Sequence, residues 1–263
     1  MACNHITDDV SPFVSAFLSK NKKISLLDLS VNELGNRFMN SLVGQTALNS
    51  TLEELILSRN PIGGRGIASF GLFLVQNQKL RILTVNGCMI EANGFIEFCN
   101  ELQRNESLEV LRIQHNPLTD DGVIKLSEAI KQNHFLREID LELVEMTDTG
   151  AYQLFPSLLE SNIENLSVRN NLIHDGSFIQ KSIQNNQKLM KLDIEYNDIN
   201  YTLNKEIMKI IAANQKRWKE DETQRIKYEL NHITSSDIQL NEVRNEIKIQ
   251  RDEIRVLKEE KER

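Results

Sequence analysis

The chain has 263 residues, of which 40% are hydrophobic, and a formal net charge of −7 at pH 7. This hydrophobic content is enough for a folded core, so the composition excludes an intrinsically disordered protein. A mildly acidic chain does not favour phosphate backbones or anionic membranes, so we expect neither nucleic acid nor membrane as a main partner.

The negative charge is confined to one part of the chain. Residues 216–263 hold 12 basic and 12 acidic side chains, so the whole excess lies in residues 1–215. The sequence has no run of eighteen apolar residues, and its first residues lack the basic-then-apolar layout of a secretory signal. Cys3, Cys88 and Cys99 have unrelated spacings, which favours buried or free reduced thiols and a cytoplasmic location.

One pattern, L-x-x-L-x-L-x-x-N-x-[LI], recurs seven times and predicts the architecture. The repeats begin at Ile24, Leu52, Leu80, Leu108, Leu136, Ile163 and Leu189, with steps of 28, 28, 28, 28, 27 and 26 residues. A period in this range indicates a solenoid of stacked repeats.

The chain begins inside a repeat, because Asn4 precedes Asn32 by 28 residues. Residues 1–23 are predicted to form an N-terminal cap in which a helix over Phe13, Phe17 and Leu18 covers the open end. Two explanations stay open: an unusual cap, or a fragment of a longer repeat protein.

Each repeat is predicted to form one strand, one turn and one helix. The leucines of L-x-L point to the same side of a strand, and Val123, Leu126 and Ile130 show the spacing of an amphipathic helix. Strands stack ~4.8 Å apart whereas helices are ~10 Å wide, so the stack must bend. We therefore predict an α/β solenoid: a right-handed horseshoe with parallel strands on the concave face and helices on the convex face, over residues 1–215.

A recurring polar position should satisfy the turns between strand and helix. It is occupied by Asn4, Asn32, Asn60, Cys88, Asn116, Val144, Asn171 and Asn197. Its amide can bond backbone groups that no sheet or helix satisfies. Cys88 is a tolerated substitute, but Val144 offers no hydrogen bond, so the fifth repeat is predicted to be irregular. Before two helices, the sequences Thr119-Asp120-Asp121 and Thr147-Asp148 are predicted N-caps.

These motifs resemble the ribonuclease-inhibitor type of leucine-rich repeat. The resemblance covers residues 1–215 and includes the repeat glycines Gly66, Gly94, Gly122, Gly150 and Gly176, whereas Val10 and Phe38 replace that glycine in the first two units. Proteins with this type of repeat bind other proteins through the arc and share no reaction, so the resemblance implies protein binding.

After the last repeat the strand pattern stops, and residues 216–263 are predicted to be a helical tail. Ile207, Ile210 and Ile211 belong to a capping helix, and from Ile226 an apolar residue recurs every seven positions. The predicted docking residues of this tail are Ile233, Leu240, Val243, Ile247, Ile254 and Leu257. A docked helix or coiled coil is the preferred interpretation, and a solvated single helix is the alternative.

No catalytic or metal-binding motif is found. Gly63-Gly64-Arg65-Gly66 lacks the spacing of a phosphate-binding loop, the five histidines lack metal-ligand spacing, and no nucleophile elbow is present. We predict no enzymatic activity, cofactor, metal or small-molecule substrate.

The outward strand positions are the predicted partner-binding residues, because they face solvent on the concave side. They are Arg59, Arg112, Gln114, His115, Asp140, Glu142, Arg169, Asn170, Asp193, Glu195 and Tyr196. Arg112, Arg169 and Tyr196 are the strongest candidates, since arginine and tyrosine are favoured interface anchors.

These features together favour a non-enzymatic scaffold, in which the arc binds one protein and the tail docks on a helical partner. The combination resembles subunits of large cytoskeletal assemblies, including leucine-rich-repeat subunits of the ciliary nexin–dynein regulatory complex. The alternative is a GTPase-activating protein of the Ran type, although the acidic C-terminal region of that family is absent here. A GTP hydrolysis assay separates the two hypotheses.

Overall fold

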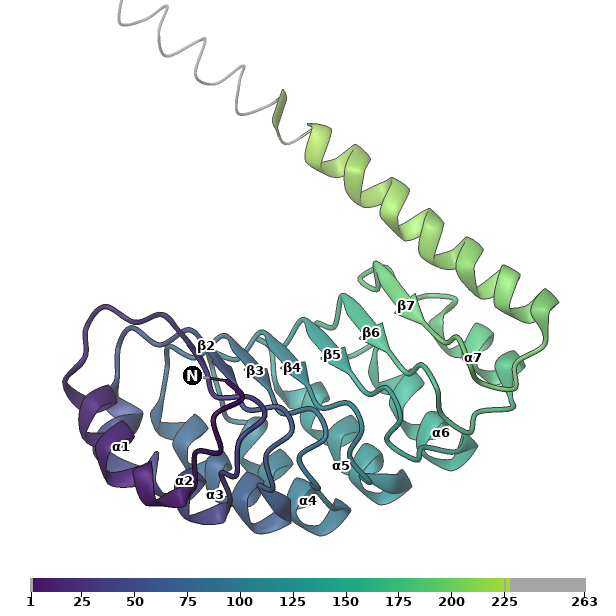
Figure 1. Ribbon diagram of the computed structural model, residues 1–263. Coiled ribbons are helices and arrows are strands. Elements are labelled where there is room, and N and C mark those ends of the chain that lie inside the picture. The colour runs from purple at the N-terminus through teal and green to yellow at the C-terminus, as the bar shows by residue number, and fades with distance from the viewer. Residues whose placement is uncertain (1, 225, 228–263) are drawn as a thin grey trace, which may run out of the picture. The chain divides into compact units, whose positions relative to one another are not determined.

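The computed structural model describes residues 2–224 and 226–227 (Figure 1). The chain divides into two compact units, Met1–Asn214 and Gln215–Arg263. All seven strands belong to the first unit, called here the repeat unit. The tail residues Ile233 to Leu257, predicted above to dock on a partner, lie outside the described residues.

The repeat unit alternates short strands with helices. Its first half contains η1 (Asp8–Val10), α1 (Ser11–Lys20), β1 (Leu26–Asp28), α2 (Asn36–Ser41), η2 (Gly44–Leu48), β2 (Glu54–Ile56), α3 (Gly63–Gln76), β3 (Ile82–Thr84) and α4 (Ala92–Leu102). Its second half contains β4 (Val110–Arg112), α5 (Thr119–Gln132), β5 (Glu138–Asp140), α6 (Asp148–Ser157), β6 (Asn165–Ser167), α7 (Gly176–Ile183) and β7 (Lys191–Asp193). Residues 201–224 are helical.

The seven strands form a single parallel sheet in sequence order, β1 to β7. Each strand pairs with the equivalent residues of the next repeat, as Leu27 does with Leu55 and Leu166 with Leu192. The strands line one side of the arc and the helices the other (Figure 1). The predicted α/β solenoid is confirmed, and its strands begin two residues after the start of each sequence repeat.

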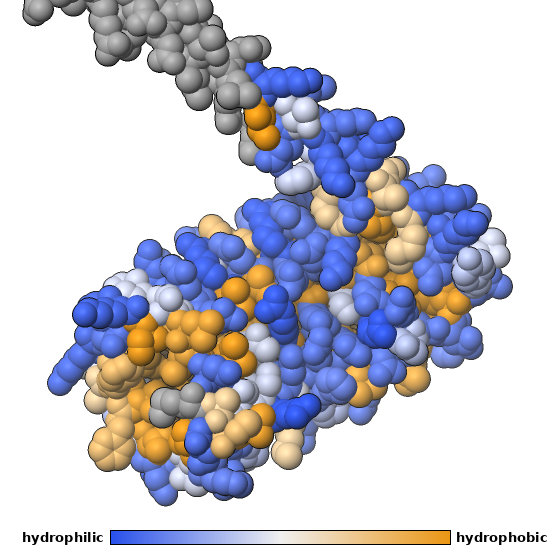
Figure 2. All heavy atoms as spheres, turned by 45° about the horizontal axis from the view of Figure 1, so that its top comes forward, coloured by the Kyte–Doolittle hydropathy of each residue, from blue (hydrophilic) through white to orange (hydrophobic). Residues whose placement is uncertain are grey.

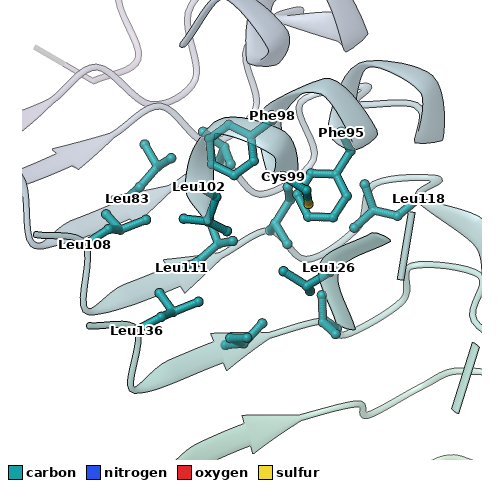
Figure 3. Close-up of a cluster of buried hydrophobic side chains, with 14 of the residues drawn as sticks. Leu83, Phe95, Phe98, Cys99, Leu102, Leu108, Leu111, Leu118, Leu126 and Leu136 are labelled. Carbon is teal, nitrogen blue, oxygen red and sulfur yellow. The ribbon is translucent and has the colours of Figure 1, made fainter. Parts of the chain in front are cut away.

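The core lies between the sheet and the helix layer and runs without a break along the repeat unit. Leu83 and Leu111 of the sheet face Phe95 and Phe98 of α4, and all four side chains are buried (Figure 3). The central apolar residue of each other strand also faces the helix layer, because alternate strand residues point to opposite faces. Cys88 and Cys99 are buried free thiols within this core, as predicted.

The predicted asparagines form a buried ladder at the turns that follow the strands. The side-chain oxygen of Asn116 accepts hydrogen bonds from the backbone N–H groups of Cys88 and Ile90 in the preceding repeat, at 2.9 and 3.0 Å. Its amide nitrogen donates to the carbonyl oxygens of Val85 and Ile113, both at 2.9 Å. The same nitrogen also donates to Gln114 O at 3.0 Å, so one side chain bonds five backbone groups in two repeats.

Where the ladder lacks asparagine, the turn of the preceding repeat is rearranged. Before Val144, the N–H of Leu118 bonds to Asn116 O at 2.8 Å and that of Thr119 to Val144 O at 3.0 Å. Thr119 then has a φ of 54°, and α5 begins there and extends for 14 residues. The strands β4 and β5 stay in register. The predicted irregularity of the fifth repeat is confirmed, because Glu145, directly after Val144, has a φ of 63°. The rearrangement also extends into the turn of the fourth repeat.

Cys88 causes the same rearrangement, so it replaces asparagine only in part. Its thiol donates to Leu57 O at 3.2 Å, and burial raises the thiol pKa to about 11, which keeps the proton in place. However, the N–H of Ile62 bonds to Asn60 O and that of Gly63 to Cys88 O, as in the turn before Val144. The helix that follows, α3, also has 14 residues.

A second polar ladder, which the sequence analysis missed, runs along the ends of the helices. It consists of Asn21, Asn49, Asn77, Asn105, Asn133, Ser161, Asn186 and Asn214. Asn105 donates to Leu74 O of the preceding repeat at 2.7 Å and accepts from the N–H of Leu108 at 2.7 Å. Asn49 and Asn105 begin N-x-[ST] sequons, but only 4% and 2% of their surface is exposed, so both amides belong to the ladder.

One of the two predicted N-caps is wrong, because its carboxylate bonds to the helix start of the next repeat. Thr147 accepts a hydrogen bond from the N–H of Thr149, as predicted for an N-cap. Asp120 instead serves the next repeat: its carboxylate accepts from the N–H groups of Thr147 and Gly150, at 2.8 and 2.9 Å. A carboxylate at the positive end of the next helix stabilises that helix start.

Helices cover the core at both ends of the repeat unit. Ile207 and Ile211, from the helix that begins at residue 201, are 0% and 5% exposed, which confirms the predicted capping helix. At the other end, Val14 and Leu18 of α1 are buried. Phe13 and Phe17 were predicted to cover that end as well, but both are exposed.

The second ladder predicts that substitutions of two adjacent asparagines differ greatly in their effect on stability. Replacing Asn186 by leucine removes the acceptor of the N–H groups of Lys188 and Leu189 and should lower the free energy of unfolding by about 1–3 kcal/mol. Asn185→Leu is the matched control, because Asn185 is exposed and should change stability by less than about 0.5 kcal/mol. Denaturant unfolding followed by circular dichroism measures both; equal effects would contradict the role assigned to the ladder.

Candidate functional site

The eleven predicted residues lie in three rows on the strand side of the repeat unit. The first row contains the last residues of strands, Arg112, Asp140 and Asp193. The second row, two residues further, contains Gln114, Glu142, Arg169 and Glu195. The third row, one residue further again, contains Arg59, His115, Asn170 and Tyr196. Alternation along the strand turns the first two rows to the concave face.

Every residue of the third row has a left-handed backbone. The φ angles of Arg59, His115, Asn170 and Tyr196 are 56° or 57°. The next residue is the ladder asparagine in these four repeats, but Gly87 and Leu143, which precede Cys88 and Val144, are left-handed as well. The conformation therefore belongs to the turn itself. The third-row side chains are exposed at the edge of the sheet. The turn thus positions part of the candidate site.

Arg169 is the centre of an ionic cluster that joins three strands. Its Nη1 atom lies 2.5 Å from Glu195 Oε2 and 3.5 Å from Asp193 Oδ2, and its Nε lies 3.8 Å from Glu142 Oε1. The guanidinium carbon is 4.3 Å from the centroid of the Tyr196 ring, a cation–π distance. Four predicted residues, at or just after the ends of β5 and β7, therefore meet around Arg169, which follows β6.

A second group lies on β4 and β5. The guanidinium of Arg112 donates through Nη2 and Nε to Glu138 Oε1, at 2.7 and 3.1 Å. The amide nitrogen of Gln114 donates to the carboxylate of Asp140, and its oxygen accepts from Asn86 at 3.1 Å. These side chains come from adjacent strands, so the pairs bridge the sheet and fix the side chains before any partner binds.

The two groups border one depression on the concave face, with a volume of about 140 Å³. Its lining residues are Glu138, Ile139, Asp140, Glu142, Asn165, Leu166, Ser167, Arg169, Lys191 and Asp193. Carboxylates outnumber cations in this lining, and the strand residues Ile139 and Leu166 lie beneath it with their side chains buried in the core. The depression is small and open, so it suits one side chain of a protein partner better than a complete small molecule.

Three predicted residues take no part in these groups. Arg59, His115 and Asn170 are exposed. Their side chains form no hydrogen bond or ion pair with another described residue. Arg59 follows β2, so β3 separates it from Arg112 and the rest of the cluster.

The sequence analysis missed three side chains that belong to this face: Glu138, Asn165 and Lys191. Each occupies the first position of its strand, two residues before the first row defined above. Alternation along the strand could have identified them, because residues two apart point to the same face. Glu138 matters most, since it is the partner of both Arg112 and Asn165.

The described residues contain no further chemical site of the kinds sought in the sequence. Within residues 2–224 and 226–227, no three histidine, cysteine, aspartate or glutamate side chains are grouped to hold a metal ion. The glycine-rich segment is structural: Gly63 has a φ of 66° at the start of α3, and the backbone of Gly64 packs directly against Gly94. Among these same residues, no helix has the length and apolar character needed to cross a membrane.

Comparison with known families agrees with the geometry. Residues 48–71, 104–127 and 185–202 match the family described as Leucine Rich repeat. The structure is a leucine-rich-repeat solenoid. The matched stretches include the strands β2, β4 and β7 and the first parts of the helices α3 and α5, so they sample the repeat along most of the solenoid.

Solved structures are similar to this chain at low sequence identity. The structure titled Leiomodin-1 Actin-Binding Site 2 (ABS2) has a TM-score of 0.52 and 18% identity, and the match covers 57% of this chain and 89% of that one. The tropomodulin C-terminal domain from Caenorhabditis elegans has a TM-score of 0.44 and 12% identity, with 81% and 98% covered. No curated protein matches the sequence.

Two positions equivalent to the third row predict changes in stability of opposite sign. Gly87 has a φ of 60°, and Val31 has a φ of 56° two repeats earlier. Gly87→Val should lower the free energy of unfolding by about 1–2 kcal/mol, because a branched side chain is strained there. Val31→Gly should raise it by about 0.5–1 kcal/mol, since relief of strain exceeds the entropic cost of glycine. Equilibrium denaturation measures both, and changes of the same sign would disprove the explanation.

Proposed function

We propose that the protein is a non-enzymatic scaffold whose concave face binds a protein partner. The observation that supports this most is the cluster around Arg169, where Tyr196 remains 69% exposed above a guanidinium held by three carboxylates. A fixed aromatic ring and charged groups at the rim of a shallow depression are typical of protein interfaces.

We further propose that the repeats are of the ribonuclease-inhibitor type and that residues 216–263 dock on a helical partner. The 28-residue period supports the first point, and the seven-residue apolar spacing from Ile226 to Ile254 supports the second. Ile226 is 46% exposed within the described residues, as expected of an apolar residue that becomes buried when a partner binds. In this proposal the tail connects the protein to a larger cytoskeletal or ciliary assembly in the cytoplasm.

Actin is the first partner to test. The leiomodin-1 structure that shares the solenoid is titled an actin-binding site, and this supports the cytoskeletal part of the proposal. Co-sedimentation of the chain with actin filaments, and its effect on actin polymerisation, would reveal binding to filament sides or ends. Absence of both effects would remove actin and leave the scaffold proposal for other proteins.

Substitutions on the concave face should weaken partner binding without unfolding the repeat unit. Tyr196→Ala and Arg169→Gln are expected to reduce the affinity for the captured partner by about tenfold or more each, as for anchor residues of interfaces. Arg65→Glu is the matched control, since Arg65 is exposed on the helix side. Affinity is measured by titration after the partner has been identified by pull-down. Loss of binding in the control alone would refute the assignment of the concave face.

Deleting residues 226–263 should separate the two proposed binding functions. The truncated chain should keep the circular dichroism spectrum of a folded solenoid, because the described core lies within residues 1–214. It should no longer be retained in the assembly, while its concave face still binds its own partner. Pull-down with the intact and truncated chains measures this, and unchanged retention of the truncated chain would reject tail docking.

A further inference from the structure

The N-terminal helix of the repeat unit carries an exposed apolar surface. Phe13 and Phe17 of α1 are 76% and 48% exposed, and Leu48 of η2, which packs beside α1, is 71% exposed. Figure 2 shows hydrophobic residues gathered at this end of the repeat unit. We call these three residues the end patch.

The end patch lies on the side of α1 opposite α2. Ser15 faces α2, because its hydroxyl donates to Ser41 O at 2.8 Å, and Val14 and Leu18 face the core. With 100° of rotation per residue, Phe13 and Phe17 fall on the remaining side and form one ridge.

Inner repeats show what normally covers this side of a helix. The residues 56, 112 and 140 positions after Phe17 are Phe73, Ala129 and Ser157, and they are 2%, 1% and 0% exposed. Each belongs to a helix that another helix precedes. Glu101, the equivalent residue of α4, is partly buried. A preceding helix therefore covers this side fully in α3, α5 and α6, and Phe17 has no such cover among the described residues.

The charges beside the end patch favour a second copy of this chain as the neighbour. Asp9 lies just before α1 and its side chain is 85% exposed, although it is 3.7 Å from Arg37. Lys20, Lys22 and Lys23, at the other end of α1, are also exposed. The surface is thus acidic, then apolar, then basic along the helix. Such a strip is complementary to its own copy when the two run in opposite directions, and antiparallel helix dipoles also attract.

The apolar area is in the range that a dimer needs. The three side chains of the end patch expose roughly 400 Å² in each copy, taking about 200 Å² for a fully exposed large side chain. A standard interface buries about 800 Å² per partner, of which about two thirds is apolar in homodimers. The end patch supplies most of that apolar part, and the flanking charged residues supply the polar rim.

We propose that two copies associate end to end through α1 around a twofold axis. The phenylalanines of both copies pack at the centre, and Asp9 of each copy faces Lys20 of the other. The dimer presents two concave faces and two tails, so it would bind a repetitive assembly with avidity. The dimer proposal does not depend on the identity of the concave-face partner.

The test is the molar mass of the full-length chain in solution, measured by light scattering and sedimentation over a wide concentration range. The wild-type chain should be a dimer. Phe13→Glu with Phe17→Glu should give a monomer with an unchanged circular dichroism spectrum, because both side chains are exposed. Leu72→Glu is the matched control, since Leu72 is 51% exposed on α3, and it should remain dimeric.

A charge exchange tests the antiparallel arrangement. Lys20→Glu should raise the dimer dissociation constant by about tenfold, because it places two carboxylates opposite each other twice in the dimer. Adding Asp9→Lys to the same chain should restore the affinity, since the pairs are then exchanged. Restoration would not occur if Lys20 contacted another surface.

Two results would overturn the proposal. One is a monomeric wild-type chain at every concentration. The other is a dimer that Ile247→Glu dissociates while the double phenylalanine variant does not, because association would then occur through the tail. Neither result would affect the concave-face proposal, which is measured with a different partner.

Discussion

The fold depends on buried amides that link each repeat to the one before it. A single strand, turn and helix leaves backbone groups without partners at both ends of the helix, and water is excluded from these places. Asn116 satisfies such groups at one end and Asn105 at the other, and each bonds to backbone atoms of the preceding repeat. No repeat is complete alone, so each repeat is stabilised by its neighbours in the stack.

Gaps in the first ladder change the turn but not the sheet. At Cys88 and Val144 no side chain accepts from the preceding turn, and in both places that turn bonds to backbone oxygens instead. The cost is two additional left-handed residues at each gap, Gly63 and Met89 at the first and Thr119 and Glu145 at the second. The strand register survives because it is determined by the apolar residues of L-x-L, which must remain on the core side. The solenoid therefore tolerates local changes of polar bonding while its core stays continuous.

The sequence predicted the strands and helices well because burial enforces their periods. Leu111 and Ile113 had to face the same side, and they do. It failed where the relevant neighbour lies a full repeat away. Asn133 looks like an ordinary polar residue after a helix, and only the stacked neighbour shows that it is buried and bonded to Leu102 O. For the same reason Asp120 was assigned to its own helix, whereas it binds the next one.

The candidate site shows the same division between what periodicity determines and what packing determines. Alternation placed Arg112, Arg169 and Glu195 on one face, but it could not show which carboxylate pairs with each guanidinium. Those pairs span strands about 4.8 Å apart, so residues 24–28 apart in sequence become nearest neighbours. A partner that binds here must compete with ion pairs that already exist, and it gains little from any charge that remains paired. Selective contact then falls to Tyr196, whose ring lies against Arg169 but remains 69% exposed, and to Arg59 and His115, which lie outside the network.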